Sequence, residues 1–201
     1  LAREWQVELL WKKHEEWKTD LEKTTKAIKS YIYNFEREFS REKDYFHFRG
    51  QDNILRCLPM GKVLVRLHED DSLFDVLGRI AAVKVAGCEL EISVPTDLKN
   101  GVTAFLLGKE GKRIVGDAKV VRQSDSELIR YIPKVQRIRY ASPGRVPAAV
   151  LEEAAKTGFY ISRTKVLMEG RLELLQYFQE QSICDNYHRY GNLGERTLVN
   201  N

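Results

Sequence analysis

The sequence predicts an α/β fold with a mainly parallel, doubly wound sheet, on three observations. Residues 61–95 read as strand, helix and strand in succession, and such a βαβ unit has parallel strands joined by a right-handed crossover. Helical and strand-like segments keep alternating up to about residue 180, which is typical of a parallel sheet covered by helices. The chain is also 43% hydrophobic and 31% charged, an ordinary balance for a soluble globular domain.

The first forty residues predict one long helix. Apolar and aromatic side chains recur at spacings of three and four, which places them along one seam: Val7, Leu10, His14, Trp17, Leu21, Thr24, Ile28, Tyr31 and Phe35. Two interpretations of this seam stay open, because it could pack on its own domain or dock on a partner outside this chain. In the second interpretation Trp17 and Tyr31 are the contact residues, and the chain forms a homo-oligomer through them.

The central βαβ unit is the best defined part of the sequence. Residues 62–67 form a short apolar, β-branched run that fits a buried strand. Ser72 and Asp75 have the spacing of a capping box, so we expect a helix over 73–86 that ends at the following glycine. Residues 89–94 alternate between polar and apolar side chains, which predicts the second strand.

The segments after this unit are predicted in less detail. We expect a helix over 97–107 capped by Thr96, and then a solvent-exposed turn at GKEGKR, residues 108–113. That hexapeptide resembles part of a phosphate-binding loop, but Arg113 stands where the loop needs a hydroxyl. We expect further strands over 118–121, 137–141 and 159–162, and further helices after Ser124, over 148–156 and over 170–179.

The residues of a nucleotide site or a catalytic site are missing from their expected places. A dinucleotide site needs a glycine-rich turn after the first strand, whereas residues 68–72, HEDDS, carry three carboxylates and no glycine. We interpret this turn as a plain helix start. His47 has no partner at metal-ligand spacing.

The thiols and the charge indicate the compartment and exclude some partners. Cys57, Cys88 and Cys184 are odd in number and far apart, which predicts free thiols in a reducing, cytoplasmic setting. Cys184, with His188 close in sequence, is the best placed of the three for reactivity. With 33 Lys and Arg against 29 Asp and Glu, we expect no nucleic-acid partner. We also expect no membrane span, since no apolar run approaches about 20 residues.

The C-terminal stretch 170–196, GRLELLQYFQEQSICDNYHRYGNLGER, is the most distinctive part of the chain. It is similar to the end of the bifunctional proline utilization A proteins, which join proline dehydrogenase to 1-pyrroline-5-carboxylate (glutamate semialdehyde) dehydrogenase. Three further stretches agree with this resemblance: GQDNILRCLP at 50–59, VLVRLHEDDSLFDVLGRIAAVKVAG at 63–87 and RVPAAVLEEAAKTGFYI at 145–161.

The resemblance implies a non-catalytic, Rossmann-like domain of the aldehyde dehydrogenase superfamily fold. It implies a β-flap, formed by the arm near 50–58 and a strand near 181–186, which covers the passage between the two active sites of the parent enzyme. The motif after this strand would reach into the aldehyde dehydrogenase domain of the parent chain. Its implied contact residues are Tyr187, His188, Arg189, Tyr190, Gly191, Asn192, Leu193 and Gly194.

The family's catalytic cysteine motif, glutamate motif and NAD-phosphate loop are not found in this sequence. We therefore expect no catalytic, cofactor-binding or metal-binding residues in this segment, although the parent would use NAD and FAD. On its own the chain should neither bind NAD nor oxidise glutamate semialdehyde. The alternative hypothesis, indicated by the α/β pattern alone, is an independent small-molecule or nucleotide-binding module.

The sequence pattern and the family resemblance together predict four segments in the chain. These are an N-terminal helical segment over 1–44, an arm or flap strand over 45–60, a Rossmann-like domain over 61–180, and a second flap strand with the C-terminal motif over 181–201.

Overall fold

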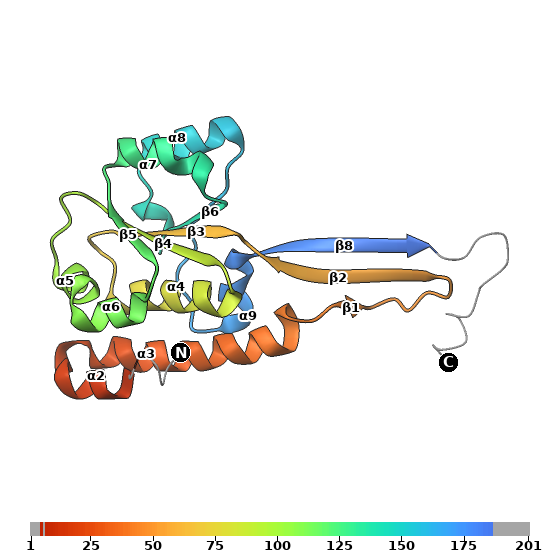
Figure 1. The fold of residues 1–201 in the computed structure, drawn as a ribbon, viewed down its shortest axis with the longest axis horizontal. Coiled ribbons are helices and arrows are strands. Elements are labelled where there is room, and N and C mark those ends of the chain that lie inside the picture. The colour runs from red at the N-terminus through yellow and green to blue at the C-terminus, as the bar shows by residue number, and fades with distance from the viewer. Residues whose placement is uncertain (1–4, 6, 187–201) are drawn as a thin grey trace.

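A five-stranded parallel sheet forms the centre of the computed structural model, which describes residue 5 and residues 7–186 (Figure 1). Its strands are β3 (Lys62–Arg66), β4 (Glu89–Val94), β5 (Lys119–Arg122), β6 (Arg137–Arg139) and β7 (Ile161–Ser162). They lie in the order β5–β4–β3–β6–β7, and every neighbouring pair is parallel. The chain therefore winds outward from β3 in both directions, which confirms the expected doubly wound α/β fold.

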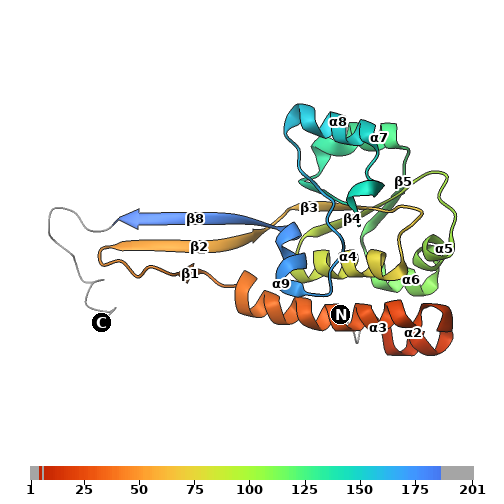
Figure 2. The ribbon, with the colours of Figure 1, turned by 180° about the vertical axis from the view of Figure 1, so that it is seen from behind.

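Helices cover both faces of this sheet (Figures 1 and 2). One face carries α4 (Leu73–Ala86), α5 (Gly101–Leu107) and α6 (Lys109–Val115). The opposite face carries α7 (Asp125–Tyr131) and α8 (Ala148–Thr157). Short 3-10 turns at Ile132–Lys134 (η3) and Pro143–Arg145 (η4) complete the connections. The helix α3 (Lys18–Asn34) runs along the outer side of α4.

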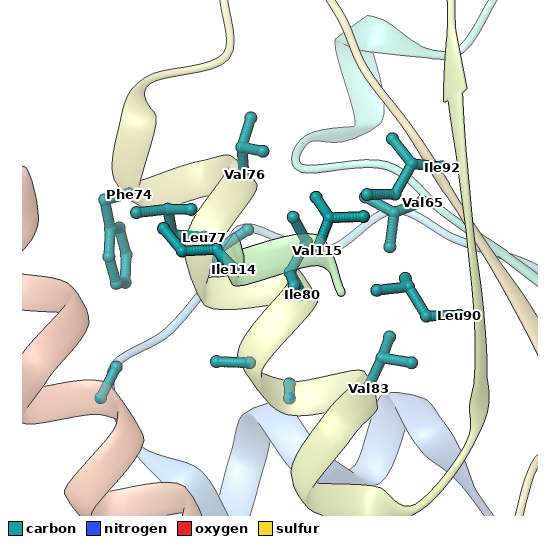
Figure 3. Close-up of a cluster of buried hydrophobic side chains, with 14 of the residues drawn as sticks. Val65, Phe74, Val76, Leu77, Ile80, Val83, Leu90, Ile92, Ile114 and Val115 are labelled. Atoms are coloured by element: carbon teal, nitrogen blue, oxygen red, sulfur yellow. The ribbon is translucent and has the colours of Figure 1, made fainter. Parts of the chain in front are cut away.

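Helix α4 is the centre of the main hydrophobic core. Eleven of its fourteen residues are buried, because the sheet covers one side of the helix and α3 covers another. Figure 3 shows the contact with the sheet and with α6, made by Val65, Phe74, Val76, Leu77, Ile80, Val83, Leu90, Ile92, Ile114 and Val115. Each fully buried aliphatic side chain of this kind contributes about 1.5–3 kcal/mol.

The bounds predicted for α4 agree with the structure. The hydroxyl of Ser72 accepts a hydrogen bond from the Asp75 amide at 3.0 Å, and the Asp75 carboxylate accepts one from the Ser72 amide at 3.2 Å. The helix ends at Gly87, whose φ of 76° lies in the left-handed region that glycine adopts readily. A second capping box, at Ser124, begins α7.

The expected long N-terminal helix is present, but it is interrupted near its start. Its parts are α2 (Val7–Lys13), a 3-10 turn η1 (Glu15–Trp17), α3 and a π turn η2 (Phe35–Phe39). The break falls at His14, whose φ of −129° and ψ of 69° are not helical. Its Nε2 atom lies 2.6 Å from a carboxylate oxygen of Glu110, and its ring stacks on Trp17. The contact with Glu110, which belongs to the distant helix α6, therefore stabilises the break.

The seam of this helix packs against its own domain. Leu10, Leu21, Thr24, Ile28 and Tyr31 are each at most 1% exposed. The first of the two interpretations is therefore correct for these residues.

Two local predictions after β4 are wrong. Helix α5 begins at Gly101 and not at residue 97, because the Asn100 side chain, and not Thr96, accepts the capping hydrogen bond from Thr103 at 2.9 Å. The predicted turn at residues 108–113 is mostly helix α6, which starts immediately after Gly108. Tertiary contact stabilises this short helix despite its internal glycine.

The end of the described chain also differs from the prediction of one helix over 170–179. The helix α9 (Gly170–Glu173) passes into a 3-10 turn η5 (Leu174–Tyr177), and a strand begins at Phe178. Among the helices of the described residues, none is both long and apolar enough to cross a membrane.

The division of the chain into four segments, over 1–44, 45–60, 61–180 and 181–201, stays a prediction.

Gly111 allows α6 to approach α5. A Cβ atom at this position would clash with the backbone carbonyl group of Leu106. We predict that Gly111→Ala lowers the free energy of unfolding by about 1–3 kcal/mol, although alanine is the better helix former by about 1 kcal/mol. Urea unfolding followed by circular dichroism measures this change.

Gly144→Ala is the matched control, because a Cβ atom there meets nothing within 4 Å. We expect this variant to change stability by less than about 0.5 kcal/mol. A stabilising effect of Gly111→Ala would show that helix propensity, and not close packing, decides this site.

Candidate functional site

A two-stranded antiparallel flap is the most distinctive surface of the molecule. Strand β2 (Gln51–Pro59) pairs with β8 (Phe178–Asn186) over nine residues, from Gln51 opposite Asn186 to Pro59 opposite Phe178. Both views show this ribbon projecting away from the helices and the main sheet (Figures 1 and 2). The flap strands implied by the family resemblance, near 50–58 and 181–186, are therefore paired with each other.

The outer edge of this flap is open. In the part of the chain that the structure describes, β8 pairs only with β2, and β2 gains a two-residue strand β1 (Lys43–Asp44) on its other side. Apart from Phe178, no residue of either flap strand is buried. Unpaired strand edges present rows of backbone donors and acceptors to another chain, so the flap is suited to an interface.

An exposed aromatic loop connects β1 to β2. Tyr45, Phe46 and Phe48 are 62%, 64% and 56% exposed, and the rings of Phe46 and Phe48 stack with centroids 5.4 Å apart. Neighbouring exposed aromatic rings of this kind are typical of interaction surfaces.

The Asp44 carboxylate holds this loop in shape. It accepts hydrogen bonds from the backbone amides of Phe46 at 2.9 Å and of His47 and Asn53 at 3.0 Å. These bonds, that from Asn53 above all, hold the pKa of Asp44 below its usual value. The ionised carboxylate thus fixes the backbone at both ends of the loop, on either side of Phe48.

The base of the flap is fixed by three stacked rings. Phe178, at the start of β8, stacks on Phe39 with centroids 4.9 Å apart and on Phe35 with centroids 6.2 Å apart. Both partners come from the π turn that ends the N-terminal helix. The direction of the flap therefore depends on the N-terminal helix, which the sequence did not indicate.

The structure separates the predicted contact residues into three groups. Tyr31 is fully buried, and its hydroxyl donates to the Leu167 carbonyl at 2.5 Å. Its predicted role as a docking residue is therefore wrong, because the ring fills the core of its own domain. Trp17 is half-buried and packs edge-on against Phe105 with centroids 5.2 Å apart. The predicted tail contacts, residues 187–194, lie outside the described residues.

The acidic turn after β3 is not the plain helix start that we expected. The Asp71 carboxylate, 1% exposed, accepts hydrogen bonds from the fully buried guanidinium of Arg79 and from Arg145, the latter at 2.8 Å. Arg145 also pairs with Asp75 at 2.8 Å. We call Asp71, Asp75, Arg79 and Arg145 the ion cluster.

The ion cluster joins two strands of the sheet. The Arg79 guanidinium donates to the carbonyl of Arg66, at the end of β3, at 2.7 Å, and to that of Arg139, at the end of β6, at 3.1 Å. These strands flank the point where the winding of the sheet reverses. In dinucleotide-binding folds the pyrophosphate lies by the turn that opens this helix. Here that turn carries carboxylates, which repel a phosphate.

Two of the three thiols are made less acidic by burial. Burial raises the pKa of the Cys88 thiol to about 11, and burial also raises the pKa of Cys57. Cys184 is exposed on β8, where its sulfur accepts a hydrogen bond from the Gln51 side chain at 2.7 Å. Its predicted neighbour His188 is outside the described residues. Within residues 7–186, no group of three or more His, Cys, Asp or Glu is arranged to hold a metal ion.

Comparison with known proteins gives matches only among solved structures. No protein-family model and no curated protein matches the chain. Proline Utilization A (PutA) from Corynebacterium freiburgense matches 83% of this chain with a TM-score of 0.54 and 23% identity. A PutA mutant from Bradyrhizobium japonicum matches 75% with a TM-score of 0.58 and 12% identity. Succinate-semialdehyde dehydrogenase from Burkholderia pseudomallei matches 72% of the chain and 31% of its own length, with a TM-score of 0.52 and 12% identity.

These likenesses identify the fold. It is that of a PutA- and aldehyde dehydrogenase-like domain, as the sequence resemblance indicated. The chain spans 14% of the length of the first PutA structure and 16% of the second, so it corresponds to one part of those longer chains.

The ion cluster leads to a stability prediction. Asp71→Asn removes the charge that compensates the fully buried Arg79, and breaking a buried ion pair in this way costs about 3–5 kcal/mol. We expect a corresponding fall in the free energy of unfolding, measured by urea denaturation at neutral pH.

Asp70→Asn provides the control next to it in sequence, because the Asp70 side chain is 72% exposed. Its effect should stay within about 0.5 kcal/mol. Equal effects of the two substitutions would mean that the cluster contributes nothing specific.

Proposed function

We propose that this chain is the non-catalytic C-terminal domain of a bifunctional enzyme that oxidises proline to glutamate. In this role it supports the 1-pyrroline-5-carboxylate (glutamate semialdehyde) dehydrogenase domain and seals the cavity through which the intermediate passes. The observation that carries the proposal is the open-edged flap, which projects from a fold like that of PutA.

The chemistry of the flap suits a sealing surface. Its free edge can add backbone hydrogen bonds to a partner, and the Tyr45–Phe48 loop can cover apolar surface on the other domain. The register pairs Asn186 with Gln51 at the far end of the flap. The motif over 187–194 follows Asn186 in the sequence, and we propose that it contacts the dehydrogenase domain.

The proposal includes no cofactor in this segment. The NAD and FAD of the parent enzyme would be bound by its other domains, and the acidic turn after β3 supports this division. We further propose a cytoplasmic location, together with contact to the aldehyde dehydrogenase domain of the parent chain or to a second copy of the enzyme.

Truncation of the full-length parent enzyme tests the proposed seal. Removing residues 187–201 should slow aldehyde oxidation and let the intermediate escape, because the motif at the end of the flap is lost. The flavin-dependent oxidation of proline should change little. Coupled kinetics, with the released intermediate trapped by o-aminobenzaldehyde, measures both steps.

A shorter truncation that removes only residues 197–201 is the matched control, since it keeps the motif over 187–196. It should behave like the intact enzyme. If the longer truncation also leaves the lag and the aldehyde dehydrogenase rate unchanged, the tail does not seal the cavity.

A further inference from the structure

One half-buried arginine lacks the counter-charge that the others have. In the described part of the chain, six arginines are buried or half-buried. Five of them bind a carboxylate oxygen directly: Arg56, Arg66, Arg79, Arg139 and Arg145. The sixth, Arg137 at the start of β6, has no carboxylate partner among the described residues. A guanidinium that is partly removed from water normally has one, because the opposite charge offsets the cost of desolvation.

The Arg137 guanidinium also lacks hydrogen-bond acceptors. Its Nε atom is buried and has no partner, and its Nη2 atom donates to the Met60 sulfur at 3.7 Å, which is a weak acceptor. Its Nη1 atom has no partner among the described residues, and it is not one of the buried atoms that lack one. Nη1 therefore faces solvent, where an oxygen acceptor can reach it.

The ring of Tyr160 holds this guanidinium in place. The Arg137 Cζ atom lies 4.6 Å from the centroid of the Tyr160 ring, which is close enough for a cation–π contact. Tyr160 itself remains 56% exposed. Burial lowers the pKa of Arg137 and the Tyr160 phenol opposes this shift, so the guanidinium stays charged at neutral pH. A planar charge held in this way loses little side-chain freedom when it binds a partner.

These side chains lie at the base of the flap. Met60 directly follows β2, and its amide donates at 2.8 Å to the carbonyl of Tyr177, which directly precedes β8. We call Met60, Arg137 and Tyr160 the flap-base patch. Arginine, tyrosine and methionine are enriched at protein interfaces. The patch therefore continues the surface that the flap offers to another domain.

We propose that the flap-base patch binds an aspartate or glutamate side chain on the dehydrogenase domain of the parent chain. The carboxylate would accept hydrogen bonds from the Arg137 guanidinium, and the protein surface around it would cover the Tyr160 ring. A free anion could supply the same charge, but it would leave this ring in water. This inference rests on the proposed function, because it adds a second contact between the two domains.

Zero-length cross-linking of the full-length parent enzyme tests this pairing. Arg137→Lys places a primary amine at the patch, and a carbodiimide joins an amine to a carboxylate only where the two are in contact. We expect mass spectrometry to find a link from position 137 to an aspartate or glutamate of the dehydrogenase domain. Lys62 and Glu89, paired at 3.0 Å, are the internal positive control. Arg130→Lys, at an exposed position on α7 away from the flap (Figure 1), should give no such link.

Every other result overturns the proposal. If the link between positions 62 and 89 forms but none forms from position 137, no carboxylate lies at the patch. A link from position 137 that stays within residues 1–201, or that joins two copies of the enzyme, would assign the patch to a different occupant. The truncation of residues 187–201 tests the proposed function separately, so that function can stand where this contact fails.

Arg137→Gln separates a contact role from a structural role. In the 201-residue chain we expect no loss of thermal stability, because the substitution removes a charge that has no internal carboxylate partner. In the full-length parent, the amides of residues 158–161 should exchange several-fold faster than in the unsubstituted enzyme, since the contact that covers them is weakened. Arg130→Gln is the matched control and should leave this exchange unchanged. Unchanged exchange in the Arg137→Gln parent would contradict the proposal, and so would an equal loss of thermal stability in both proteins.

Discussion

The burial of helix α4 is the constraint on which the rest of the structure depends. The helix lies between the parallel sheet and α3, and Arg79 within it is fully buried. A guanidinium in such a place needs compensating charge and acceptors. Asp71 supplies the charge, and the last carbonyls of β3 and β6 supply acceptors. The turn between β3 and α4 is therefore built around an ion pair, in the place where nucleotide-binding relatives of this fold carry glycines.

The same packing determines where the flap can go. Strand β2 leads directly into β3, and β8 follows the turn after α9, so both flap strands leave the domain at one end (Figure 1). At this end, the Phe178 ring of β8 stacks on the rings of Phe35 and Phe39 in the π turn of the N-terminal helix. A projecting flap with a firm base suits a domain that covers another domain, and this is the role that we propose for it.

Local signals in the sequence predicted α4 with its capping box, the start of a helix after Ser124 and the alternation of strands and helices, because these features depend on neighbouring residues. The pairing of β2 with β8 joins residues more than a hundred positions apart, so only the family resemblance indicated it. The interruption at His14 and the helix around Gly111 were missed, since Glu110 and Leu106 decide them through tertiary contact. The ion cluster was missed for the same reason: Arg79 and Arg145 are separated from Asp71 by 8 and 74 positions.

The proposed site could be predicted only in part. The family resemblance predicted the flap strands and the terminal motif. The exposed aromatic loop depends on three backbone amides that donate hydrogen bonds to Asp44, and no sequence pattern predicted these bonds. Tyr31 shows the opposite error, in which a core residue is predicted to be a contact residue. An aromatic residue on a helical seam gives the same sequence pattern whether it packs in the core or binds a partner.

Hydrogen–deuterium exchange tests the central claim, that the flap is covered by the rest of a larger enzyme. Amide exchange in the 201-residue chain would be compared with exchange in the full-length parent. We expect that the amides of β8 and of the loop over 45–48 exchange more slowly in the parent. The exchange rates of the β4 amides in the core should be the same in both proteins. Equal exchange of β8 and this loop in both proteins would contradict the claim.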